Sequence, residues 1–156
     1  MRKRIIVPDP TTEGGNAHWL DLTALVDVEV TSEAESHPIE RAILLGEQGG
    51  WRASGSGNQT IRLLFNEPQR LTRILLIFDE HEVARTQEFV LRWSSAAGAP
   101  YREIVRQQWN FSPPNTVREL EDYRVELSNV AVLELTISPD IGRAGAVASL
   151  TQLRVG

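Results

Sequence analysis

The sequence predicts an all-β domain in which about eight short strands form an antiparallel sandwich or barrel. Apolar and polar residues alternate over 60–65 and again over 88–93. Between these segments, residues 71–78 form a nearly continuous apolar run. Alternation with a period of two indicates a strand with one solvated face, and a short unbroken run indicates a strand covered on both faces. The three segments therefore predict three consecutive strands at the centre of the fold.

Weaker patterns predict the remaining strands. Apolar residues alternate over 26–30, 123–127 and 133–137, and more loosely over 101–111. A last strand is expected over 148–155, where the chain is again mostly apolar. Short strands separated by turn signals are typical of β-sandwiches and barrels.

The connections between these strands carry turn chemistry. Asn, Pro, Gly and Ser predict turns or loops at 66–69, 94–100, 112–115 and 128–129. A highly charged loop is expected at 79–86. Each predicted strand is therefore bounded by residues that end strands.

The length of 156 residues suits one domain with a core large enough to fold alone. We expect residues 1–25 to form a partly irregular N-terminal lead-in and residues 26–156 to form the sandwich domain. Within the lead-in, the mixed spacing of 18–25 is compatible with a strand or a helical turn. A short helix is expected over 38–45, where Pro38 suits the first helical turn.

Composition excludes several classes of function. The chain has no cysteine, so disulfides and cysteine-based zinc sites are impossible. Its net charge of −5 disfavours a nucleic-acid partner, because phosphate binding relies on clustered Lys and Arg. The basic start at residues 2–4 is followed by only three apolar residues, and no run is long enough to insert into a membrane. We therefore expect a cytoplasmic protein.

Catalytic signatures are also missing from the sequence. The three histidines are His18, His37 and His81, and no Gly-x-Ser-x-Gly motif supplies a nucleophile. The pairs of nearby carboxylates lie in loops that are expected to be exposed. We therefore expect that the protein is not an enzyme.

The order of several motifs resembles that of discoidin domains, the coagulation factor type C family. The similarity covers roughly residues 26–155. It is carried by the strand and polar loop at 28–33, the segment 37–43 followed by Gly50-Trp51, the paired strands within 59–77, and the closing strand at 150–155. It implies a galactose-binding-like fold, which is an antiparallel jelly-roll β-sandwich. It also implies a non-catalytic module that binds glycans, phospholipid headgroups or proteins through loops at one end.

The chain departs from this family where many members bind calcium. The matching loop at 44–49 has Glu47 as its single carboxylate, and Gln152 stands where a glutamate is often found. Calcium prefers six to eight oxygen ligands with several carboxylates among them. We therefore expect no cofactor, with Glu47 as the one weak candidate for a metal ligand.

Sugar binding is the most concrete function that these residues suggest. A sugar presents an apolar ring face and vicinal hydroxyls, which suit an aromatic platform beside planar hydrogen-bonding groups. Trp109 is equally compatible with a core position, and Arg85 with a structural ion pair. The candidate ligand-binding residues are Arg52, Asn58, His81, Arg85, Trp109 and Asn110.

Two alternatives to a glycan partner stay open at this stage. The lack of a signal peptide and the altered calcium loop favour a protein-interaction module within an intracellular assembly. A shorter similarity, in Trp51-Arg52-Ala53 and Thr60-Ile61, is to the N-terminal domain of a DNA single-strand-break repair scaffold. The acidic net charge opposes that second alternative. No feature of the sequence indicates an oligomeric state.

Overall fold

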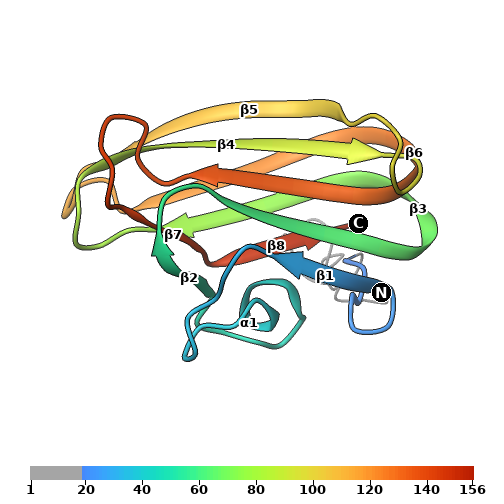
Figure 1. The fold of residues 1–156 in the computed structure, drawn as a ribbon, viewed down its shortest axis with the longest axis horizontal. Coiled ribbons are helices and arrows are strands. Elements are labelled where there is room, and N and C mark those ends of the chain that lie inside the picture. The colour runs from blue at the N-terminus through green and yellow to red at the C-terminus, as the bar shows by residue number, and fades with distance from the viewer. Residues whose placement is uncertain (1–18) are drawn as a thin grey trace, which may run out of the picture.

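The computed structural model describes residues 19–156, which form eight strands and one short helix (Figure 1). In order, the elements are β1 (Val26–Val30), α1 (Glu40–Ile43), β2 (Trp51–Ser56), β3 (Gln59–Asp79), β4 (Arg85–Ser94), β5 (Arg102–Phe111), β6 (Arg118–Ser138), β7 (Val147–Leu150) and β8 (Gln152–Val155). The expected antiparallel architecture of about eight strands is confirmed.

The strands form where alternation places every second side chain in the core. In the first half of β3, Ile61, Leu63 and Phe65 are buried, while the residues between them are half-buried. In β4, Phe89 and Leu91 are fully buried. The side-chain period of two therefore fixes which face of each strand points inward.

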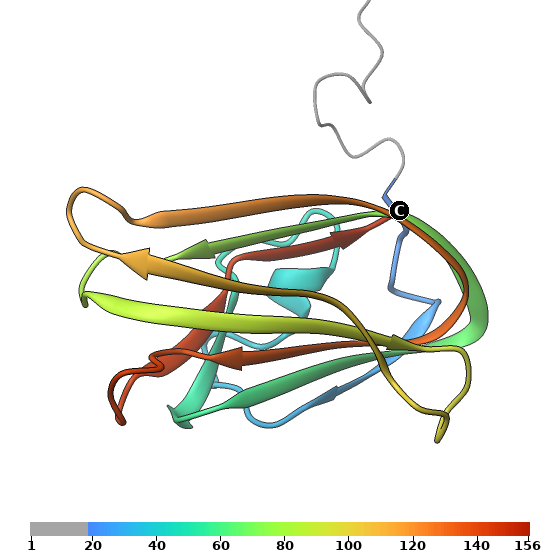
Figure 2. The ribbon, with the colours of Figure 1, turned by 90° about the horizontal axis from the view of Figure 1, so that it is seen from above.

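Strands β3 and β6 connect the two layers of the sandwich. They pair with each other along most of their length, from Gln59 opposite Ile137 to Asp79 opposite Arg118. Both bend sharply at the same end of the molecule, so each contributes one half to each layer (Figure 2). The first half of β3 pairs with β1, and the second half with β8. Strands β4 and β5 extend the layer that contains the second half of β6.

The bends correct two predictions of the sequence. The turn expected at 66–69 and the turn expected at 128–129 are bends inside continuous strands. Residues 65–68 have no partner in the β3–β6 ladder, so Pro68 removes no ladder hydrogen bond. Asn129 adopts a left-handed conformation with φ of 65°, which lets β6 change direction. Turn chemistry is present at both places, but the chain passes from one layer to the other.

Other boundaries also differ from the expected ones. The closing strand divides at Thr151 into β7, which pairs with β2, and β8, which pairs with β3. Helix α1 spans four residues within the expected segment 38–45. Residues 19–25 form turns and contribute the buried side chain of Leu22 to the core. The expectation for residues 1–18 lies outside the described residues.

The core between the layers is built around aromatic side chains. Phe78 stacks on Phe89 with ring centroids 5.3 Å apart, and Phe89 meets the edge of Tyr123. Trp51 is 1% exposed, and its Nε1 donates a hydrogen bond to the carbonyl of Ser32 over 2.9 Å. Trp93 is only half-buried and packs against the edge of this core. Among residues 19–156, no helix has the length and apolar character that crossing a bilayer requires.

Candidate functional site

Four connections lie at one end of the sandwich, which we call the loop end. They are the turn at 57–58, the β3–β4 loop at 80–84, the β5–β6 loop at 112–117 and the β6–β7 loop at 139–146. Figure 1 shows the last three at the left, opposite the bends of β3 and β6. Backbone hydrogen bonds join neighbours: Ile141 N donates to Thr86 O, Gly57 N to Ala146 O, and Glu80 N to Val117 O.

Arg85 holds two of these loops together. Its Nε donates to Oε1 of Glu80 over 2.7 Å, and its Nη1 donates to the carbonyl of Pro139 over 2.8 Å. The guanidinium lies 4.7 Å from the ring centroid of Phe111. The side chain is 1% exposed, so these contacts are shielded from water. Arg85 therefore connects the β3–β4 loop with the β6–β7 loop through buried hydrogen bonds.

A cavity of about 350 Å³ opens between the loops that Arg85 joins. We call it the loop-end cavity. Its volume lies in the range of small-ligand sites. Two further hollows of the surface, of about 430 and 320 Å³, adjoin it and share parts of the β6–β7 loop with it. The main contributors of side chains to its wall are Arg52, Glu80, Glu82, Val83, Asp140 and Arg143.

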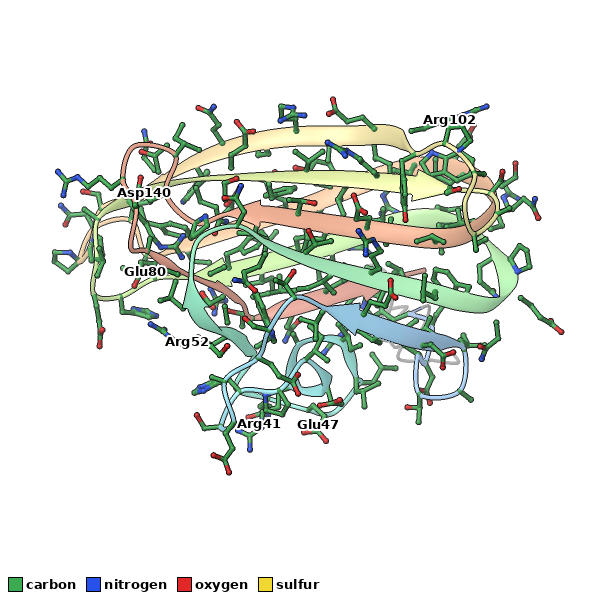
Figure 3. The ribbon with its side chains drawn as sticks, viewed as in Figure 1. Arg41, Glu47, Arg52, Glu80, Arg102 and Asp140 are labelled. Atoms are coloured by element: carbon green, nitrogen blue, oxygen red, sulfur yellow. The ribbon has the colours of Figure 1, made fainter. Side chains whose placement is uncertain are left out.

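The wall of the loop-end cavity carries both signs of charge. Burial opposes ionisation of Glu80, but hydrogen bonds from Arg85 and from the backbone N–H of Glu82 outweigh it and lower the pKa of Glu80. Glu80 is therefore a carboxylate at neutral pH. Arg52 and Arg143 are exposed, and neither forms an ion pair with the residues that the structure describes. Figure 3 shows Arg52, Glu80 and Asp140 toward the same end of the molecule.

The six expected ligand-binding residues fall into separate places. Arg52 and Arg85 line the loop-end cavity, and Asn58 lines the adjoining hollow beside the β6–β7 loop. His81 is exposed on the β3–β4 loop and does not line the hollows described here. Burial opposes ionisation of the nearby Asp79, but hydrogen bonds from Arg118 and Thr151 outweigh it and lower the pKa of Asp79.

Trp109 and Asn110 lie in a different groove, on strand β5. This groove of about 480 Å³ also contains Gln107, Gln108 and Thr116. Trp109 is half-buried, and its Nε1 has no hydrogen-bond partner within residues 19–156. The side-chain oxygen of Asn110 accepts a hydrogen bond from Thr86 on β4. The structure therefore does not bring the expected aromatic platform to the wall of the loop-end cavity.

Sequence reasoning missed most of the cavity wall. The expected ligand-binding residues do not include Glu80, Glu82, Asp140 or Arg143, which all line the cavity. Val83 is also missed, although its side chain is 55% exposed beside these charges. The signal that could have found them is the alternation of an antiparallel meander, in which every second connection lies at the same end of the sheet.

The loop after α1 contains Glu47, the weak candidate for a metal ligand. Glu47 is exposed, and no group of three or more His, Asp and Glu residues among 19–156 is arranged to hold a metal. Instead, the buried Arg154 donates from Nη1 to the carbonyl of Ala42 and from Nη2 to that of Leu44. A guanidinium thus binds the carbonyl oxygens at the end of α1. Figure 3 places Glu47 beside α1 and away from the loop end.

Comparisons with known proteins identify the fold. No protein-family model matches the chain, and no curated protein matches it. Among solved structures, the family 32 carbohydrate-binding module (CBM) of NanJ from C. perfringens, in complex with galactose, matches with a TM-score of 0.59 at 13% identity, over 83% of this chain and 92% of that chain. CBM32-3 from a family 31 glycoside hydrolase of Clostridium perfringens matches with a TM-score of 0.62 at 17% identity, over 91% and 96%.

A third structure broadens the range of bound sugars. The CBM32 of AlyQ, in complex with 4,5-unsaturated mannuronic acid, matches with a TM-score of 0.60 at 17% identity, over 85% of this chain and 95% of that chain. At these identities the likeness shows a shared fold. The chain therefore has the galactose-binding-like β-sandwich fold of family 32 carbohydrate-binding modules, which discoidin domains also share.

Proposed function

We propose that this protein is a non-catalytic carbohydrate-binding module, related to discoidin domains, that holds a glycan in the loop-end cavity. One observation carries the proposal: loops from distant parts of the sequence meet around a single cavity whose wall offers both guanidinium groups and carboxylates. Sugar hydroxyls donate and accept hydrogen bonds, so a wall of both kinds suits them. The modules of the same fold that hold galactose and an unsaturated mannuronic acid support this choice.

The exposed side chains of the wall take different roles in this proposal. Arg52 and Arg143 donate hydrogen bonds to sugar oxygens, because their guanidinium groups have no ion-pair partner among the described residues. Glu82 and Asp140 accept from sugar hydroxyls. Val83 offers an apolar contact to the C–H groups of the ring. Arg85, which is buried, holds the loops in place and does not contact the sugar.

Replacing both exposed arginines should abolish most of the binding. We expect Arg52→Ala with Arg143→Ala to weaken glycan binding by at least about tenfold, because each charge-assisted hydrogen bond contributes roughly 1.5–3 kcal/mol. A glycan array that includes galactose, N-acetylgalactosamine and uronic acid oligosaccharides would identify the ligand, and isothermal titration calorimetry would then measure the Kd of both proteins.

Arg102→Ala is the matched control for this experiment. Arg102 is exposed at the opposite end of the sandwich, where its guanidinium lies 5.8 Å from the ring of Trp93 (Figure 3). Its removal should leave the Kd unchanged. The proposal fails if the wild-type domain binds no glycan on the array, or if the double variant and the control bind equally well.

We also propose that the domain works without calcium. The carbonyl oxygens of Ala42 and Leu44 already accept hydrogen bonds from Arg154, and Glu47 is solvated. A chelator should therefore shift the Tm by less than about 1 °C, because a ligand that does not bind the folded state cannot stabilise it. Differential scanning fluorimetry with EDTA and then with excess calcium would measure this. A calcium-dependent rise of several degrees would contradict the proposal.

A further inference from the structure

A buried polar network begins at Arg85 and continues into the space between the layers. Nη1 of Arg85 donates to Oε1 of Gln87 over 3.0 Å, and Nε2 of Gln87 donates to Oε1 of Glu119 over 3.1 Å. Further along β6, the hydroxyl of Tyr123 donates to Glu121 over 2.9 Å. Gln87 and Glu119 are fully buried. The network therefore connects the residue that holds the two loops with carboxyl groups inside the sandwich.

Two atoms of this network have no hydrogen-bond partner among the described residues. They are Nη2 of Arg85 and Oε2 of Glu119. One belongs to a cation and is a donor, and the other belongs to a carboxyl group and becomes an acceptor when that group is ionised. Gln87 alone separates the two residues in the network. The resting structure thus keeps apart two groups that would attract each other strongly if Glu119 were ionised.

The surroundings of Glu119 keep its proton in place at neutral pH. Burial and the nearby charge of Glu121 raise the pKa of Glu119 to about 8, and the hydrogen bond from Gln87 only partly offsets them. On β5, Trp109 and Phe111, which pair with Gln87 and Arg85, have no titratable group. On β3, the residue paired with Glu119 is Phe78, which does not titrate. The titratable groups that interact with Glu119 are Arg85 of β4 and Glu121 and Tyr123 of β6, and Arg85 in turn contacts Glu80 of the β3–β4 loop.

We propose that Glu119 is a positioning residue for the loop-end cavity. In its neutral form it leaves Arg85 bound to Glu80 and Pro139. When it loses its proton, the new carboxylate draws the guanidinium of Arg85 toward Oε2 and away from both loops. The loops then lose the contact that joins them, and the cavity loses its shape. The effect on glycan affinity rests on the proposed function, but the movement of Arg85 does not.

Nuclear magnetic resonance can follow Arg85 without any ligand. In the wild-type domain, the Nε–H resonance of Arg85 should shift between pH 6.5 and 9.5 with a midpoint near that of Glu119, because its hydrogen bond to Glu80 is replaced. In Glu119→Gln the resonance should not move, since the amide stays neutral and can still accept the hydrogen bond from Gln87. A wild-type resonance that is constant over this range would overturn the proposal.

Glu121→Gln is a second variant, and its expected effect would not arise if the role of Glu119 were merely structural. Removing the charge of Glu121 removes one cause of the raised pKa. The midpoint of the Arg85 transition should therefore move to lower pH. An unchanged midpoint would argue that Arg85 responds to some other group. This variant and the wild-type titration keep the test decisive even if Glu119→Gln does not fold.

The glycan experiment then separates this inference from the proposed function. Affinity for galactose, or for the glycan identified on the array, should fall by about tenfold from pH 7 to pH 9.5 in the wild type and stay constant in Glu119→Gln. If no glycan binds at any pH while the Arg85 resonance titrates as described, the proposed function is wrong and the coupling stands. If a glycan binds with the same pH dependence in both proteins, the coupling is wrong.

Discussion

Replacement of Trp51 by alanine should lower the free energy of unfolding by about 4 kcal/mol, because removal of a buried Trp leaves a large cavity in the core. The side chain is 1% exposed, and its indole N–H donates to the carbonyl of Ser32. The alanine variant loses that hydrogen bond as well, so Ser32 O is left without its partner. For a domain of ordinary stability this loss is a large fraction of the total. Urea denaturation followed by circular dichroism would measure it.

Trp51→Phe is the matched control for the cavity. Phenylalanine keeps much of the buried ring and removes only the N–H group and part of the volume. We expect it to cost about 1–2 kcal/mol, which is well below the cost of the alanine variant. Equal losses for the two variants would show that the hydrogen bond to Ser32, and not packing, is the main contribution of Trp51.

Gly50→Ala should be the second most damaging single change, with an expected cost of about 3 kcal/mol. Gly50 has a φ of +68°, in the left-handed region that residues with a Cβ rarely adopt. A Cβ added here would also lie 2.7 Å from the carbonyl oxygen of Leu150 and 3.0 Å from Cα of Thr151. Both contacts are with backbone, so the pairing of β2 with β7 must shift to make room.

Gly46→Ala separates the cost of the left-handed conformation from the cost of the close backbone contacts. Gly46 has a similar φ of +83°, but a Cβ there meets nothing within 4 Å. It should therefore cost only the left-handed strain, about 1 kcal/mol. Thermal and urea unfolding of both variants would measure the difference. If Gly46→Ala destabilises the domain as much as Gly50→Ala, close packing against β7 is not the reason for glycine at position 50.

The strands could be predicted from the sequence because burial in a sandwich imposes a period of two. Ile61, Leu63 and Phe65 show it clearly, and so do Phe89 and Leu91. The continuity of β3 and β6 could not be predicted. A bend between layers and a turn between hairpin strands both use residues such as Asn, Pro and Gly, since both need a break in the ladder. Only the partner strand, which bends at the same end, distinguishes them.

The candidate site was less accessible to sequence reasoning. Residue type predicts Arg52 and Arg85 as binding residues, and both line the same cavity. Residue type also favours Trp109, an aromatic beside an amide, but strand pairing places it opposite Gln87 on β4, in another groove. Arg143 lies in a loop whose place at the same end depends on the whole topology. Local sequence identifies the kinds of groups that bind sugars, whereas long-range pairing decides which of them meet.

The sharing of β3 and β6 between both layers has a consequence for how the domain unfolds. Neither layer contains a complete set of strands of its own, because each takes one half of β3 and one half of β6. Separation of the layers would require both strands to break at their bends. The sandwich therefore opens as one cooperative unit, and amide protons in both layers exchange with solvent through the same global event. The loops at the loop end lie outside these strands and can open locally, which leaves local motion where a ligand would enter.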